Sequence, residues 1–190
     1  MRVIAGTARG RRLAAPGDST VRPTADRVRE ALFSILTSRR ENLAGCRVLD
    51  LFAGTGALGI EALSRGASQA VFVDSRQSSL RLVEKNLALT GLSAAGRTVA
   101  MDARQALALL VRQGARFDLV FCDPPYRDLV VRDQVLAMLG SGELLATDAI
   151  VVIEGAARDL APEAVGLLHR DDSRTYGDTA ITFFTLSTGE

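Results

Sequence analysis

The sequence contains few residues of the kinds that bind metal ions or form disulfides. It has two cysteines, Cys46 and Cys122, and a single histidine, His169. Each cysteine lies within an apolar run, which is typical of a small buried side chain rather than of a disulfide. Because no paired-cysteine spacing is present, nothing supports a structural zinc site, and we expect no metal ion.

Long apolar runs are also missing. No stretch is long enough to cross a bilayer, and residues 1–12 lack the apolar segment and cleavage site of a signal peptide. A chain of 190 residues, 47% of them hydrophobic, can bury one sizeable core. We therefore expect a single domain over residues 1–190, located in the cytoplasm and without membrane contact. We also expect a monomer, because no spare hydrophobic stripe requires a partner.

Lysine is nearly absent, since Lys85 is the only one, and arginine carries the positive charge. Residues 1–40 hold nine arginines and three acidic residues, although the whole chain has a formal net charge of +1. A basic segment on a mildly acidic body is typical of polyanion binding, because clustered cations displace the counterions of phosphates. A solvated arginine-rich surface would give the same pattern, and charge alone does not separate the two.

From residue 46 onward, short apolar runs alternate with longer segments of helical periodicity. The pattern predicts strands at 46–52, 70–74, 97–102, 117–123 and 149–154, and helices at 57–66, 78–91, 104–114 and 128–139. This alternation predicts an α/β fold with a doubly wound, mostly parallel sheet covered by helices on both faces. The tail, 164–186, has two strand-like runs with no helix between them, which predicts an antiparallel C-terminal hairpin at the sheet edge.

Residues 1–40 depart from this alternation and predict a basic extension packed on a core of residues 41–190. MRVIAG and RRLAAP resemble short strands, and we expect them to pair as a small β-hairpin. Residues 24–36 predict an amphipathic helix, with Thr24 as its N-cap. Its apolar stripe comprises Val28, Ala31, Leu32, Ile35 and Leu36.

A glycine-rich turn, with Gly54, Gly56 and Gly59, joins the first predicted strand to its helix. Glycines let a backbone approach a ligand closely, and the start of the helix offers free N–H donors. The spacing matches G-x-G-x-x-G, and Asp74 follows at the distance expected for a ribose-binding acid. A dinucleotide-binding site therefore fits this segment equally well.

Several predicted strands end in aspartate, at Asp50, Asp74, Asp102 and Asp123. In a doubly wound sheet, these ends line the ligand crevice. Asp50 would repel a pyrophosphate, whereas a cofactor with a cation, ribose hydroxyls and an adenine amine could use all of these carboxylates. S-adenosylmethionine fits that description. Each aspartate could instead cap the following helix, an explanation that suits one of them better than all of them.

The fourth predicted strand runs into Asp123, Pro124, Pro125 and Tyr126. Two prolines end sheet pairing and stiffen the turn. Together with Asp50-Leu-Phe-Ala-Gly-Thr-Gly, this motif resembles the class I S-adenosylmethionine-dependent methyltransferases, Rossmann-like enzymes that modify exocyclic amines of nucleobases. The resemblance implies that Asp123 and the Pro124 carbonyl accept the amine hydrogens and that Tyr126 stacks on a base turned out of its helix, which makes these residues catalytic.

The resemblance covers essentially the whole chain. RVIAGTARGRRL (2–13), RPTADRVREALFSIL (22–36) and the tail YGDTAITFF are similar to the bacterial 16S rRNA guanine-N2 methyltransferases of the RsmD type, which modify guanine 966. This implies S-adenosylmethionine as the cofactor. It also implies 16S rRNA as the partner, either naked or within a small-subunit assembly intermediate or 30S subunit.

The resemblance further implies a set of binding residues. Those implied for the cofactor are Asp50, Phe52, Gly54, Gly56, Asp74, Asp102 and Asp123. Those implied for the substrate are Pro125, Arg9, Arg11, Arg12, Arg22, Thr24, Arg27 and Arg29. Asp74 departs from the glutamate more usual in the family, although either carboxylate can bind ribose hydroxyls.

Other functions share parts of this pattern. Adenine-N6 DNA methyltransferases carry the same four-residue motif, but they usually add a target-recognition domain, for which this chain has no room. A non-catalytic assembly factor that binds S-adenosylmethionine and RNA through a relic site would be expected to have lost some of the motif. A dinucleotide-dependent oxidoreductase leaves the prolines unexplained.

Overall fold

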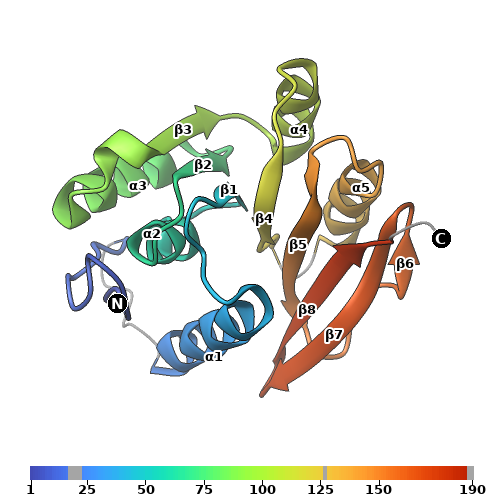
Figure 1. The fold of residues 1–190 in the computed structure, drawn as a ribbon, viewed down its shortest axis with the longest axis horizontal. Coiled ribbons are helices and arrows are strands. Elements are labelled where there is room, and N and C mark those ends of the chain that lie inside the picture. The colour runs from blue at the N-terminus through green and yellow to red at the C-terminus, as the bar shows by residue number, and fades with distance from the viewer. Residues whose placement is uncertain (17–22, 126–127, 188–190) are drawn as a thin grey trace.

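The computed structural model describes residues 1–16, 23–125 and 128–187, which form an α/β structure around one sheet (Figure 1). The described strands are β1 (Arg47–Leu51), β2 (Gln69–Asp74), β3 (Gly96–Ala100), β4 (Phe117–Cys122), β5 (Leu145–Ala156), β6 (Ala164–Val165), β7 (Leu168–Tyr176) and β8 (Thr179–Leu186). Their spatial order is β3-β2-β1-β4-β5-β8-β7-β6. Strands β1 to β5 pair in parallel and β6 to β8 are antiparallel, which confirms the predicted sheet and its C-terminal hairpin.

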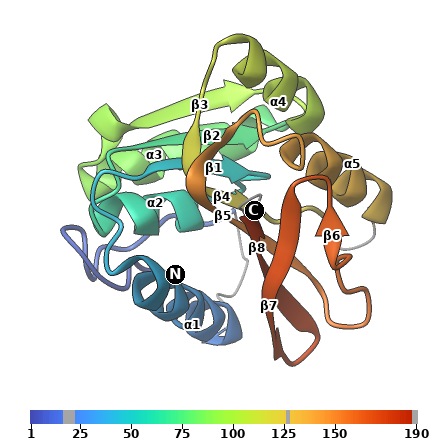
Figure 2. The ribbon, with the colours of Figure 1, turned by 45° about the vertical axis from the view of Figure 1, so that its right-hand side comes forward.

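Helices cover both faces of this sheet. They are α1 (Pro23–Arg40), α2 (Ala57–Ser64), α3 (Gln77–Thr90), α4 (Ala103–Arg112) and α5 (Leu129–Leu139), with a 3-10 turn η1 (Ser93–Ala95). Helices α1, α2 and α3 contribute to one hydrophobic cluster, and α4 and α5 contribute to a second cluster on the opposite face (Figure 2). Within the described part of the chain, no helix has both the length and the apolar character needed to cross a membrane.

The central strands are apolar on both faces because both faces are covered. In β1, Val48 belongs to the first cluster and Leu49 to the second, and both side chains are fully buried. Cys46 and Cys122 are buried and free, as predicted. The chain builds β1, β2 and β3 outward in one direction and then returns to place β4 on the other side of β1. The carboxyl ends of β1 and β4 therefore flank the point where the strand order reverses, which is where such sheets bind ligands.

The ends of the N-terminal segment pair as the expected hairpin, although only briefly. Arg2 and Arg12 form an antiparallel bridge, and the N–H groups of Val3 and Leu13 donate to the carbonyls of Arg11 and Met1, at 3.0 and 3.1 Å. The backbone between the paired ends also hydrogen-bonds to α2. The N–H groups of Ile4 and Ala5 donate to the carboxylate of Glu61, at 2.8 and 3.0 Å. We call residues 1–16 the N-terminal arm. The predicted pairing is therefore confirmed, but it is limited to a bridge and does not form regular strands, because the segment between the paired ends folds against α2.

Helix α1 begins at Pro23, one residue before the expected N-cap. Proline suits a first helical position because its fixed φ matches the helix and its missing N–H needs no partner there. Thr24 thus lies inside the first turn and does not occupy the N-cap position. The apolar stripe is present, with Leu32 and Leu36 buried, and the helix continues to Arg40, beyond the predicted end.

Candidate active site

The turn after β1 is shaped by unusual backbone conformations. Phe52, Gly54 and Gly56 have φ values of 62°, 55° and 74°, in the left-handed region that residues other than glycine rarely adopt. Gly56 precedes the first residue of α2. Gly59 lies so close to β2 that an added Cβ would stand 2.3 Å from a ring carbon of Phe72. The glycines thus allow a tight turn and close packing of α2 on the sheet.

Asp50 is buried beneath this turn, with 3% of the residue exposed, and its Oδ2 accepts a hydrogen bond from the Gly59 N–H at 2.9 Å. One of the free donors at the start of α2 is therefore already used by a carboxylate, which disfavours a pyrophosphate at that position. Burial raises the pKa of Asp50 to about 7, an effect that the Gly59 hydrogen bond opposes and the charge of Asp74 increases.

Asp74 links the ends of β1 and β2. Its Oδ2 accepts from the Gly54 N–H at 3.0 Å, and its Oδ1 accepts from the Arg76 N–H at 2.8 Å. The residue is 6% exposed. Since each carboxylate oxygen has a second lone pair, both could accept a further hydrogen bond from a ligand.

Asp102 behaves as a helix cap. It precedes α4, and its Oδ1 accepts from the backbone N–H of Arg104 at 2.9 Å. The Arg104 side chain also pairs with it, and these hydrogen bonds lower the pKa of Asp102. The capping explanation therefore fits Asp102, whereas the buried carboxyls of Asp50 and Asp74 accept hydrogen bonds across the glycine turn.

The two prolines carry the chain away from the sheet at the end of β4. The Asp123 N–H still donates to the Leu51 carbonyl, at 3.4 Å, which holds this residue beside the turn after β1. Pro124 is buried and Pro125 is exposed. Among the described residues, the Pro125 carbonyl accepts from the Asp128 N–H at 2.8 Å, while no backbone donor reaches the carbonyl of Pro124. The Pro124 carbonyl thus lies next to the Asp123 carboxylate.

A further carboxylate, Glu154 of β5, lies beside Asp123. Cys122 and Ile153 are register partners in β4 and β5, so the residues that follow them are neighbours. Both acidic residues line a small cavity with Leu32 of α1. Burial, followed by the charges of Glu154 and Asp50, raises the pKa of Asp123 well above its usual range. The sequence offered a signal for Glu154, because it ends the fifth apolar run.

The N-terminal arginines fall into different environments. Arg9, Arg11, Arg12 and Arg27 are exposed. Arg29 is only 5% exposed, and its Nη2 donates to the Arg2 carbonyl at 2.6 Å and pairs with Asp26 at 3.0 Å. In this conformation Arg29 holds the N-terminal arm against α1, and its guanidinium is not at the surface.

Two of the predicted site residues, Arg22 and Tyr126, lie outside the described residues. Thr24 is described only as part of α1. The structure brings together Asp50, Asp74 and Asp123 at the carboxyl ends of adjacent strands.

The chain is similar to known proteins over nearly all of its length. The family described as Conserved hypothetical protein 95 matches residues 1–185. Ribosomal RNA small subunit methyltransferase D of Escherichia coli K12 is 35% identical over 173 residues, which cover 90% of this chain and 83% of that protein.

Solved structures extend the comparison. A hypothetical protein of Thermus thermophilus superposes with a TM-score of 0.81 at 32% identity, covering 98% of this chain and 99% of that one. A SAM-dependent methyltransferase from Agrobacterium tumefaciens, 19% identical, has a TM-score of 0.66 over 92% of this chain and 66% of its own. The predicted fold class, that of the class I methyltransferases, is confirmed.

Proposed function

The chain belongs to the Conserved hypothetical protein 95 family, the RsmD type, and from this premise we propose that it methylates ribosomal RNA using S-adenosylmethionine. At the finer level we propose the exocyclic N2 amine of a guanine in 16S rRNA, guanine 966 by family resemblance. The observation that carries the proposal is the Asp123-Pro124 turn, where the Asp123 carboxylate and the adjoining Pro124 carbonyl stand beside the glycine turn.

The residues around the glycine turn fit the cofactor. Gly54 and Gly56 present bare backbone, and the carboxylate of Asp74 has lone pairs for the ribose hydroxyls. The carboxyls of Asp50 and Asp123 provide negative charge for a cationic group. When bound, S-adenosylmethionine supplies a methyl group on a positively charged sulfur. Phe52 and Asp102, at the same edge of the sheet, complete the proposed cofactor site, since the Asp102 carboxylate that caps α4 keeps further lone pairs for a ligand.

The amine nitrogen of a nucleobase is a poor nucleophile because its lone pair is delocalised into the ring. Asp123 and the Pro124 carbonyl would each accept one amine hydrogen, which favours a pyramidal nitrogen with its lone pair directed at the methyl group. These interactions strengthen towards the transition state, when positive charge develops on the nitrogen. Holding the amine in line supplies much of the remaining acceleration. The Asp123 carboxylate, or solvent, then takes the released proton.

We also propose that residues 1–40 form an RNA-binding extension on a methyltransferase core of residues 41–190, together a single domain. Val3 and Leu13 of the N-terminal arm are buried in the same cluster as Phe72 of β2, so the extension shares the core. The RNA contacts proposed are Pro125, Arg9, Arg11, Arg12, Arg22, Thr24, Arg27 and Arg29, with Tyr126 as the stacking residue. Arg29 would act by positioning the N-terminal arm.

Replacing Asp74 with alanine should weaken S-adenosylmethionine binding by about tenfold to a hundredfold, because a charged acceptor for the ribose is lost. Isothermal titration calorimetry measures this affinity. Asp148→Ala, an exposed aspartate near the amino end of β5, is the matched control and should bind the cofactor normally. Equal affinity in Asp74→Ala and the control would contradict the ribose assignment.

Replacing Glu154 with glutamine should move the acidic limb of the pH–rate profile to lower pH. Asp123 must be ionised to accept the amine hydrogens, so activity falls as the pH drops through its raised pKa. Among the described residues, the charged groups facing this region include Asp50 of β1, Glu154 of β5 and Arg132 of α5. Removing the Glu154 charge lowers the pKa of Asp123. An unmoved limb, or the same shift in the exposed control Glu143→Gln, would refute this electrostatic role.

The function is tested by offering labelled S-adenosylmethionine with unmodified small ribosomal subunits, naked 16S rRNA or double-stranded DNA, followed by mass analysis of the nucleosides. We expect N2-methylguanosine from a ribosomal substrate only. N6-methyladenine in DNA would show that the substrate is DNA and not rRNA. No product from any of them would favour a binding protein without catalysis.

A further inference from the structure

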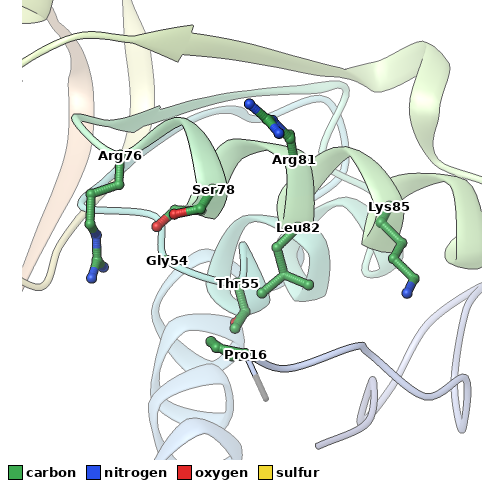
Figure 3. A pocket seen from close by; sticks show the side chains of 9 residues that line it. Pro16, Gly54, Thr55, Arg76, Ser78, Arg81, Leu82 and Lys85 are labelled. Carbon is green, nitrogen blue, oxygen red and sulfur yellow. The ribbon is translucent and has the colours of Figure 1, made fainter.

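A pocket of about 420 Å³ lies at the glycine turn, where Gly54 and Thr55 line it, and Asp123 is not among its lining residues. One wall is the side of α3 that carries Leu82, and the other is formed by Thr55 of the turn and Pro16 of the N-terminal arm. Figure 3 shows Arg76 and Lys85 at opposite ends of the pocket, with Leu82 and Thr55 between them.

Of the residues that the structure describes, the charged ones lining this pocket are the cations Arg76, Arg81 and Lys85. Two acids lie nearby. Asp74 pairs with the Arg76 side chain at 3.6 Å, and Glu84 accepts a hydrogen bond from the Thr98 hydroxyl and so faces β3. Lining hydroxyls from Thr55 and Ser78 add hydrogen-bond donors. This chemistry disfavours the positively charged sulfur of the cofactor and suits an anion with several oxygen acceptors.

A buried side chain fixes the walls of the pocket relative to each other. Asn86 is 0% exposed, and its Oδ1 accepts from the Ala14 N–H at 2.7 Å. Its Nδ2 donates to the carbonyls of Ala14 and Thr55, at 3.1 and 2.9 Å. Asn86 thus ties the N-terminal arm, α3 and the glycine turn together, so that the pocket is a built feature rather than a gap between loose segments.

The positive charge continues from the pocket along α3 to the N-terminal arm. Arg81, Lys85 and Leu89 are spaced four residues apart and therefore share one side of the helix. The Arg11 side chain donates to the Leu89 carbonyl at 3.2 Å, which places an arginine of the arm at the end of this row. A chain of phosphates could follow these cations.

We propose that this pocket binds backbone phosphates of the RNA substrate, and that Arg81 and Lys85 are contacts that hold the strand while its target base lies at Asp123. The inference rests on the proposed function and adds α3 to the RNA-binding surface. The shared chemistry is that of a phosphate, which RNA or a free phosphate ion could provide. The contacts carry no base information, so they should act equally on RNAs of different sequence.

The test is the double variant Arg81→Gln with Lys85→Gln, which preserves helix propensity on an exposed face. Binding to 16S rRNA is measured by filter retention at several salt concentrations. We expect a loss of about tenfold or more, and a salt slope smaller in magnitude by between about 1.4 and 1.8, the value for two lost phosphate contacts. Affinity for S-adenosylmethionine should stay unchanged.

The matched control is Arg112→Gln with Arg116→Gln, which removes the same charge beyond the amino ends of the strands, away from the pocket. RNA affinity and salt slope that match the control would overturn the proposal, as would a selective loss of cofactor affinity. The proposal would also be overturned if inorganic phosphate bound the wild-type pocket while the variant bound RNA as well as the wild type does.

Methyl transfer by the wild-type protein separates this inference from the proposed function. If the wild-type protein methylates rRNA and the Arg81 and Lys85 variant binds RNA normally, the pocket is not an RNA-binding site but the proposed function is supported. The opposite result is that the wild-type protein methylates no substrate, while the variant has a lower RNA affinity and a smaller salt slope. This result would support the pocket as an RNA-binding site and contradict the proposed methyltransferase function.

Discussion

Asp123→Ala should reduce methyl transfer by about 100- to 1,000-fold, the usual effect of removing one preorganised group that stabilises developing charge. Single-turnover rates with saturating S-adenosylmethionine and rRNA measure this loss. Cofactor affinity, followed by calorimetry, should fall far less, because the glycine turn and Asp74 remain. The loss thus belongs to the step in which the amine is held and deprotonated.

Misfolding does not explain such a loss, and the sign of the pKa shift shows why. The pKa of Asp123 is raised in the folded protein, so the ionised carboxyl destabilises the fold, and stability falls as the pH rises through the folded pKa. Removing the carboxyl should therefore leave the melting temperature at pH 8 unchanged or higher. Asp133→Ala, at an exposed aspartate of α5, is the control and should keep full activity. Full activity in Asp123→Ala would show that Asp123 is not needed to accept the amine hydrogens.

The fold was largely predictable because its signals are local. Buried parallel strands appear as short apolar runs, and α3 ends at Gly91, whose φ of 73° is the left-handed stop expected of a helix-terminating glycine. The ends of strands were less predictable. Strand β5 begins at Leu145, four residues before the predicted start, because pairing with β4 through a register shift extends it beyond its apolar run.

The packing of the N-terminal arm was not predictable from local sequence. The pattern of residues 1–16 was enough to predict that the two ends of the arm pair with each other, but nothing within that segment identifies the surface it packs against. That surface is α2, more than fifty residues away in the chain, whose Ser64 hydroxyl accepts from the Ala8 N–H. A weak signal existed in α2, because Glu61 is the only charged residue in an otherwise apolar helix.

The site shows the same division between sequence spacing and tertiary contacts. Spacing along the chain was enough to place Asp50, Asp74 and Asp123 at one edge of the sheet. It did not show which of the aspartates also caps a helix, as Asp102 does at α4, because a cap and a ligand-binding acid occupy the same position after a strand. Nor did it predict the burial of Arg29, which depends on contact with the N-terminal arm.

Glu61→Ala should be the most destabilising of the substitutions considered, by about 3–5 kcal/mol. The Glu61 side chain is 1% exposed and pairs with Arg65 at 2.8 Å, in addition to its hydrogen bonds from Ile4 and Ala5. Truncation leaves a largely buried guanidinium and two backbone N–H groups without their acceptor. Thermal unfolding should occur on the order of 10 °C lower, as measured by circular dichroism.

A second readout separates loss of the N-terminal arm from general weakening. If Glu61 holds the arm, then below the unfolding transition trypsin should cut after Arg9, Arg11 and Arg12 faster in Glu61→Ala than in wild type, and mass spectrometry should find a core that lacks these residues. Glu84→Ala, which removes an exposed carboxylate bonded to Thr98, is the matched control and should leave cleavage unchanged. If Glu61→Ala melted and were cleaved like this control, the arm would be held by its buried apolar residues, Val3, Ala8 and Leu13, and Glu61 would have no anchoring role.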